Sequence, residues 1–262
     1  DPLWSRGLGD VYKRQCQTCW PFASTRVETY YKKAKISIPF ADVAQNSFIN
    51  YDFLNPIASR LRSIIVLGGE PFYDPKCLEF LYWAKDHTSA DILTFTNGSV
   101  VDMDLLTSFN RKITLVFSLD AASRAAEYIR FGTDWNKVWE NYQKVKTVTN
   151  VTVRVNITTS PYNYVYIADL IDLLVEDWPE VVSFGPTAER FLCEQIVPLS
   201  LRPKIIVSLN HALKKLIEAT IEKDQKSNAI NAISSIIKNL QSLPYDQGLH
   251  QEFINFVGKM DT

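Results

Sequence analysis

The run Ser63-Ile64-Ile65-Val66-Leu67-Gly68-Gly69-Glu70-Pro71 decides the fold of this chain. Residues 63–67 form an apolar run that ends in glycine, which is typical of a β-strand buried on both faces. The paired glycines let a ligand approach the backbone closely. Asp74 then precedes a helical pattern over 75–87, where its carboxylate can cap the first turn. The stretch predicts a strand, a loop with a candidate site, and a helix.

The same alternation of strand and helix continues to Phe184. The sequence predicts further strands over 91–96, 113–118, 151–157 and 180–184, with helices between them over 102–109, 135–148 and 162–176. Sustained alternation with crossovers of this length indicates a parallel sheet, either open or rolled into a barrel. The expected fold class is therefore α/β, with five visible parallel strands.

The region after Pro186 has a different pattern. We expect a loop to about Pro203, followed by helices over 205–223 and 229–242. These helices would form a C-terminal helical extension that packs on the sheet.

Composition limits the classes of function. The 262 residues are 46% hydrophobic and 12% aromatic, enough for a substantial core. With 28 basic and 29 acidic residues, the formal charge of −1 argues against a nucleic-acid binder that works by bulk charge. No apolar run approaches the roughly 20 residues of a membrane span, so no membrane partner is expected. The four cysteines do not suggest a secreted disulfide framework, and a cytoplasmic location is expected.

Polar residues gather where the predicted strands end, which is where ligands bind in parallel α/β folds. Ser118 and Asp120 suit a ribose or an amino-acid head group, and Arg130 is a natural partner for a ligand carboxylate. A single Gly-Gly or Asn-Gly more often forms a turn than a site, but here all such segments fall at one end of the sheet. They are Gly68-Gly69-Glu70-Pro71, Thr96-Asn97-Gly98, Ser118-Leu119-Asp120, Asn156 with Thr158 and Thr159, and Gly185-Pro186-Thr187.

The pair Cys16-Gln17-Thr18-Cys19 is by itself a weak metal motif. What precedes it is unusual, because Ser5 to Gln15 can be translated back into codons that resemble the adapter of transposase-based sequencing libraries. We therefore expect 1–15 to be an artefactual leader. The natural protein would continue upstream of Cys16, and its C-terminus would also be truncated. Cys77 and Cys193 are expected to be packing residues.

Taken together, the Cys-x-x-Cys pair, Gly-Gly-Glu-Pro, Thr-Asn-Gly and Ser-x-Asp at successive strand ends resemble the radical S-adenosylmethionine (radical SAM) enzymes. Tyr128-Ile129-Arg130 and the helix opening Trp135-Asn136-Lys137-Val138 look most like the subgroup with an additional "twitch" cluster domain. The resemblance implies a partial (β/α)6 TIM-like barrel whose first strand is missing. The expected domains are the leader 1–15, the radical SAM core 16–198 and the helical extension 199–262.

The resemblance also implies roles for individual residues. Cys16 and Cys19 would be two of three ligands of a 4Fe-4S cluster. That cluster would donate the electron that cleaves S-adenosylmethionine to a 5′-deoxyadenosyl radical, which abstracts hydrogen from a substrate. The backbone of Gly68 and Gly69 would bind the amino group of S-adenosylmethionine, and Glu70 would support their turn. Ser118 and Asp120 would contact its ribose or methionine portion, and Arg130 its carboxylate. Asn156 would contact the ribose, and Asn97 would be a further contact.

The chain departs from the family pattern at Tyr12, which stands where the first cluster cysteine is expected. A phenol is a poor replacement for a thiolate on an iron–sulfur cluster, so this chain is expected to be impaired. An electron donor is an expected partner, and a peptide, a nucleotide or a sugar can be the substrate. One alternative is a non-catalytic barrel that binds a nucleoside-like ligand or a partner, with Cys16 and Cys19 binding zinc or no metal. An aldolase-type barrel lacks support because no strand ends in a lysine.

Overall fold

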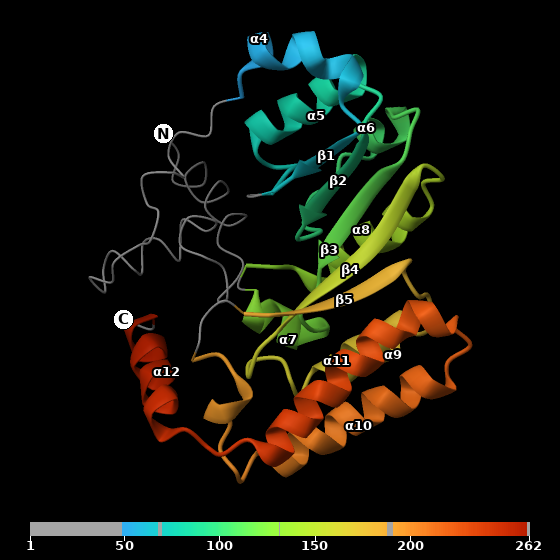
Figure 1. The fold of residues 1–262 in the computed structure, drawn as a ribbon. Helices are drawn as coiled ribbons and strands as arrows, with labels where there is room; N and C mark the ends of the chain where they lie inside the picture. Colours follow the sequence, from blue (N-terminus) through green and yellow to red (C-terminus); the bar gives the residue numbers. More distant parts are fainter. Residues whose placement is uncertain (1–48, 68–69, 131, 188–190, 261–262) are drawn as a thin grey trace. The chain divides into compact units, whose positions relative to one another are not determined.

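The computed structural model describes residues 49–67, 70–130, 132–187 and 191–260. Residues 258–260 are described by their backbone alone. Within these ranges five strands alternate with helices and form a parallel sheet in the order β1-β2-β3-β4-β5 (Figure 1). The expected α/β class is confirmed, and the arrangement is consistent with a partial TIM-like barrel. The strands are β1 Ser63–Val66, β2 Asp91–Thr96, β3 Ile113–Ser118, β4 Val151–Thr159 and β5 Val181–Pro186.

Acidic side chains start three of the helices that connect these strands. Asp74, Asp102 and Asp134 each accept a backbone N–H of the first turn, which satisfies donors that a helix start leaves unpaired. The helical elements in the described part of the chain are α4 Tyr51–Leu54, η2 Asn55–Arg60, α5 Pro75–His87, α6 Met103–Ser108, α7 Ser123–Ile129, α8 Trp135–Lys146, α9 Ile167–Leu174, η3 Glu194–Ile196, α10 Arg202–Glu218, α11 Lys223–Ser242 and α12 Gln247–Met260. None of them is long and apolar enough to cross a membrane.

The described residues divide into two compact units that interleave along the chain. The first unit holds 49–118 and 132–154, and the second holds 119–130 and 155–260. The chain therefore leaves the first unit after β3, returns to it for α8, and leaves it again within β4.

In the first unit, β1, β2 and β3 are parallel, and Ile92 lies opposite both Ile64 and Ile113. These three side chains are buried, as strand alternation requires. The expectation that β1 is buried on both faces is wrong, because Ile65 remains 61% exposed and Leu67 70% exposed. Only the face of β1 that carries Ile64 and Val66 packs into the core.

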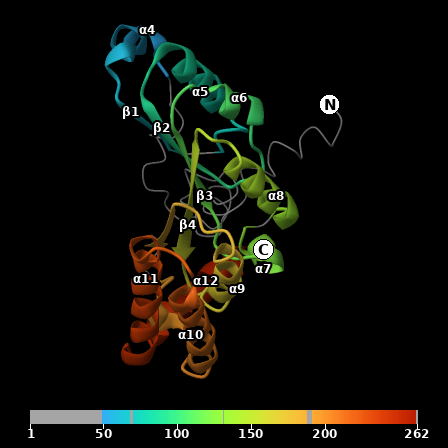
Figure 2. The same cartoon turned by 90° about the vertical axis from the view of Figure 1, so that its right-hand side faces the viewer.

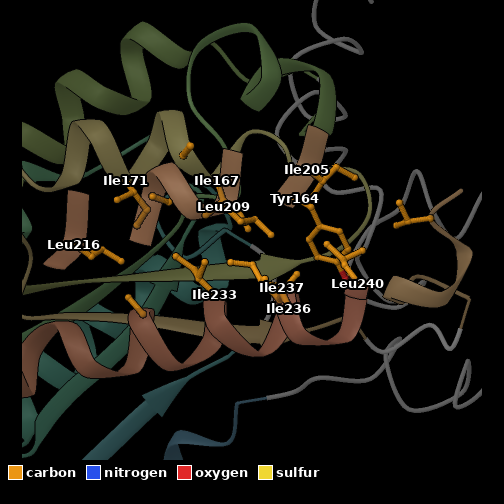
Figure 3. Packing of buried hydrophobic residues seen from close by; sticks show 14 residues of the cluster. Tyr164, Ile167, Ile171, Ile205, Leu209, Leu216, Ile233, Ile236, Ile237 and Leu240 are labelled. Carbon is orange, nitrogen blue, oxygen red and sulfur yellow. The ribbon is translucent and has the colours of Figure 1, made fainter. Parts of the chain in front are cut away.

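The second unit has a hydrophobic core built largely from helices. In Figures 1 and 2, α10 and α11 lie side by side, and α9 contacts α10. Figure 3 shows how aliphatic side chains from the three helices meet. The expected helical extension is thus present, and it shares a core with α9 and its flanking residues. The residues of this core are Tyr164, Ile167, Ala168, Ile171, Val197, Ile205, Leu209, Ala212, Leu216, Ala229, Ile233, Ile236, Ile237 and Leu240.

Some predicted boundaries in this region are wrong. The helix expected over 162–176 is the shorter α9, because Asn163 holds a turn before it. The loop expected to reach Pro203 ends earlier, since α10 begins at Arg202 with Pro203 in its first turn, where a missing N–H does no harm. The sequence reasoning did not predict α7 or α12.

Candidate functional site

Glu70 ties the ends of β1 and β2 together. One carboxylate oxygen accepts the hydroxyl proton of Thr96 at 2.7 Å, and the other accepts the backbone N–H of Asn97 at 2.8 Å. The side chain is only 4% exposed, and hydrogen bonds to a carboxylate are among the stronger ones in proteins. The Glu70 carbonyl also accepts the N–H groups of Tyr73 and Asp74. Glu70 therefore fixes the backbone that follows the paired glycines.

The turn after β2 is equally constrained. The side-chain oxygen of Asn97 accepts the N–H of Ser99 at 2.7 Å, and Asn141 donates to the carbonyl of Gly98 at 2.8 Å. Gly98 has φ of 77°, in the left-handed region that favours glycine. A Cβ there would lie 2.9 Å from the ring of Phe117. Close packing at the strand end therefore fixes the position of Asn97.

In the second unit, Asp120 and Arg130 form a buried ion pair. One Asp120 oxygen accepts from Nε of Arg130 at 2.9 Å and from its Nη2 at 2.8 Å, while the other accepts the N–H of Thr158 at 2.8 Å. Asp120 is 1% exposed and Arg130 is 9% exposed. Asp120 precedes α7 and Arg130 directly follows it, so the pair joins the two ends of the segment that contains this helix.

Asn163 completes this arrangement, although no motif in the sequence pointed to it. Its side-chain nitrogen donates to the carbonyls of Asp120 and Thr158, both at 2.9 Å, and its oxygen accepts the N–H of Ser160 at 2.9 Å. It is fully buried. We call Asp120, Arg130, Thr158 and Asn163 the Arg130 network. An asparagine after a strand is ordinarily read as a turn residue, and that is why its role was missed.

Asn156 and Ser118 are both half-buried at strand positions. The side-chain oxygen of Asn156 accepts from the hydroxyl of Ser183 at 3.0 Å, and its backbone carbonyl accepts the N–H of Leu119. Ser118 is the last residue of β3. Asn156 thus lies on the strand that pairs with the segment leading to Asp120.

The structure brings some of the predicted site residues together. Glu70 contacts Asn97 in the first unit, and Asp120 contacts Arg130 in the second. The predicted residues Cys16, Cys19, Gly68 and Gly69 lie outside the described residues, as does the predicted leader 1–15. Within the part of the chain that is described, no three His, Cys, Asp or Glu side chains are grouped as metal ligands.

Cys77 and Cys193 are half-buried free cysteines. Burial raises the pKa of the Cys77 thiol, and the negative charges of Asp74 and Glu70 raise it further. Since the thiolate is the form that binds metals and attacks electrophiles, Cys77 is poorly suited to either task at neutral pH. The half-buried position and the raised pKa of Cys77 are compatible with the packing role expected for it.

Comparison with known proteins gives a match at the level of structure. No family model matches the chain, and no curated protein matches it. The structure of native anSMEcpe with bound AdoMet is 15% identical, with a TM-score of 0.52, and the match covers 82% of this chain and 59% of that one. Native anSMEcpe with bound AdoMet and Kp18Cys peptide is 14% identical, with a TM-score of 0.54 and the same two coverages.

A third similar structure is that of Streptococcus suis SuiB bound to S-adenosylmethionine. It is 18% identical with a TM-score of 0.44, and the match covers 58% of this chain and 35% of SuiB. The chain thus spans 59% of the length of the anSMEcpe structures. The likeness to anSMEcpe shows that this chain shares its α/β fold.

Proposed function

We propose that this chain is the partial catalytic core of a radical SAM enzyme that binds S-adenosylmethionine at the carboxyl ends of its parallel strands. The observation that carries the proposal is the fold shared with two structures that contain AdoMet. The buried Glu70 carboxylate supports it, because two hydrogen bonds fix the backbone beside Gly69 at that end of the sheet. Ligands of parallel α/β folds bind at this end.

The proposed ligand contacts follow the strand ends. Backbone groups of Gly68 and Gly69 would bind the amino group of S-adenosylmethionine, with Glu70 holding their loop. Arg130 would bind its carboxylate, which a guanidinium matches in geometry and charge. Ser118 and Asn156 would contact the ribose portion. Asn97, fixed by its turn, would add a further contact at the end of β2.

The proposed metal site lies at the Cys-x-x-Cys pair. Cys16 and Cys19 have the thiolate chemistry that a 4Fe-4S cluster requires, and a third ligand would complete the set. When bound, the cluster supplies the electron that cleaves S-adenosylmethionine to a 5′-deoxyadenosyl radical. The chain's own residues bind and orient the molecule that is cleaved. An external electron donor is therefore a required partner.

We favour a peptide over a nucleotide or a sugar as the substrate. One of the similar structures contains a peptide together with AdoMet, and it has the same fold as this chain. The twitch-type subgroup is proposed from Tyr128-Ile129-Arg130 at the end of α7 and Trp135 at the start of α8. The domain limits 16–198 and 199–262, the leader 1–15 and a cytoplasmic location belong to the same proposal.

The test restores the missing cluster ligand. A Tyr12→Cys variant of the full chain is reconstituted anaerobically with iron and sulfide and then reduced in the presence of S-adenosylmethionine. We expect cluster absorbance and the formation of 5′-deoxyadenosine, whereas Cys16→Ser in the same background should lose both. A reconstituted variant that shows neither signal contradicts the proposal. Ligand binding with a formed cluster but without product would instead favour a non-catalytic binding module.

A further inference from the structure

We propose that Asp120 and Asn163 are positioning residues that orient Arg130 toward a ligand carboxylate. Asp120 then acts on the ligand through Arg130 and makes no direct ligand contact. This inference rests on the proposed binding of S-adenosylmethionine. It goes beyond that proposal by assigning a role to Asn163, which lies outside every motif in the sequence.

Both oxygens of Asp120 are engaged within the protein. One binds Nε and Nη2 of Arg130 and the other binds the N–H of Thr158, all at 2.8–2.9 Å. The carboxylate is also 1% exposed. A carboxylate with these contacts is better suited to fix its partners than to bind a nucleoside, and this is why a positioning role is proposed for Asp120 in place of a direct contact to the ribose or methionine portion.

Two contacts from one guanidinium to the same oxygen fix the orientation of the Arg130 side chain. The guanidinium is planar, and a carboxylate ligand is recognised best when that plane is already aligned with it. Buried ion pairs add little net stability, because removing both charges from water offsets their attraction. The buried pair in this network is therefore better explained by positioning than by stabilisation of the fold.

Asn163 fixes the backbone that carries the Asp120 carboxylate. The side-chain nitrogen of Asn163 donates to the backbone carbonyls of Asp120 and Thr158. The N–H of Thr158 in turn donates to the Asp120 carboxylate. The backbone of Asp120 and the end of β4 are thus held by one buried side chain. Loss of Asn163 would leave both carbonyls without this donor, and the Thr158 N–H would be the remaining bond from the end of β4 to Asp120.

The experiment compares Asn163→Ala with Asn150→Ala in the full chain. Asn150 is a matched control, since its side-chain nitrogen also donates to two backbone carbonyls, those of Leu106 and Phe109, and neither belongs to the Arg130 network. The first readout is the exchange of the Arg130 Nε–H with solvent, followed by NMR and assigned with Arg130→Lys. The second readout is the affinity of the protein for S-adenosylmethionine divided by its affinity for the decarboxylated analogue. This ratio reports how much the ligand carboxylate contributes to binding.

In Asn163→Ala we expect Nε–H exchange to become about tenfold faster and the affinity ratio to fall about tenfold, which corresponds to roughly one lost hydrogen bond between neutral groups. Asn150→Ala should lower the Tm and change neither readout. If Asn163→Ala does not fold, Asp120→Asn gives the same comparison, because it keeps the side-chain shape and removes the charge. Unchanged Nε–H exchange in the folded variants overturns the positioning role. Failure of the unvaried chain to bind S-adenosylmethionine overturns the proposed function instead, and the exchange data still decide the role of Asn163.

Discussion

At the scale of single residues, Gly98 is a position that accepts glycine far better than any other residue. Its positive φ and the nearby rings and methyl groups of Phe117 and Val138 both exclude a side chain. Because Asn97 precedes it, the geometry of Gly98 also sets the turn at the end of β2.

Gly98→Ala is therefore expected to lower the free energy of unfolding by about 1–3 kcal/mol, the usual cost of a strained residue. Gly185→Ala is the matched control, since a Cβ there would meet no atom within 4 Å. Urea denaturation of both variants measures the difference. Equal stability of the two variants would show that the turn relaxes at little cost.

The sequence predicted most individual strand residues but few of their side-chain partners. Polar residues after an apolar run mark the end of a strand, so Glu70, Asn97 and Asp120 could be assigned to the site edge. The partners of Asp120 could not be predicted, because Thr158 and Asn163 follow it by 38 and 43 residues. Such contacts depend on how the strands are arranged in space, which local patterns do not encode.

At the scale of elements, the outcome of prediction follows the strength of the local signals. The strands 91–96 and 113–118 and the helix 75–87 have the predicted bounds, because each has a regular apolar pattern and a clear start or end. Helix α7 was missed because it is short and its N-cap, Ala122, has no capping side chain that would mark its start. Residues in that helix were interpreted only as a ligand motif.

The helical extension depends on one buried arginine. Arg202 in α10 donates to the carbonyls of Val197, Leu240, Leu243 and Glu194, and so joins the start of α10 to the end of α11. Arg202→Met should lower the free energy of unfolding by at least about 2 kcal/mol, because buried carbonyls lose their donors. Lys204→Met, an exposed change on the same helix, is the control. Chemical denaturation followed by circular dichroism measures both, and similar midpoints would contradict the role given to Arg202.

At the scale of the whole molecule, the second unit shares its core between segments on both sides of the predicted boundary at residue 198. Ile167 and Ile171 from α9 pack with Leu209 from α10 and Ile233 from α11 (Figure 3). These contacts mean that the helical extension completes the core of that unit.

Deletion of residues 199–262 is thus expected to abolish the cooperative unfolding of the second unit and to expose its apolar surface, which binding of a hydrophobic dye would report. Deletion of 247–262 removes α12 alone and leaves the cluster of Figure 3 intact, so it should retain a cooperative transition. A chain of residues 1–198 that binds no dye and keeps the unfolding transition of the second unit would show that this unit is independent of the extension.

The interleaving of the two units has a consequence for synthesis on the ribosome. Asp120 and Arg130 are translated only ten residues apart, but Asn163 follows Asp120 by 43 residues. At typical elongation rates, about 2–9 s separate the synthesis of Asp120 from that of Asn163. During this interval the nascent chain makes residues 132–154, which belong to the first unit. The first unit can therefore be completed while the Arg130 network is still open, and the second unit must wait for α11 to leave the ribosome.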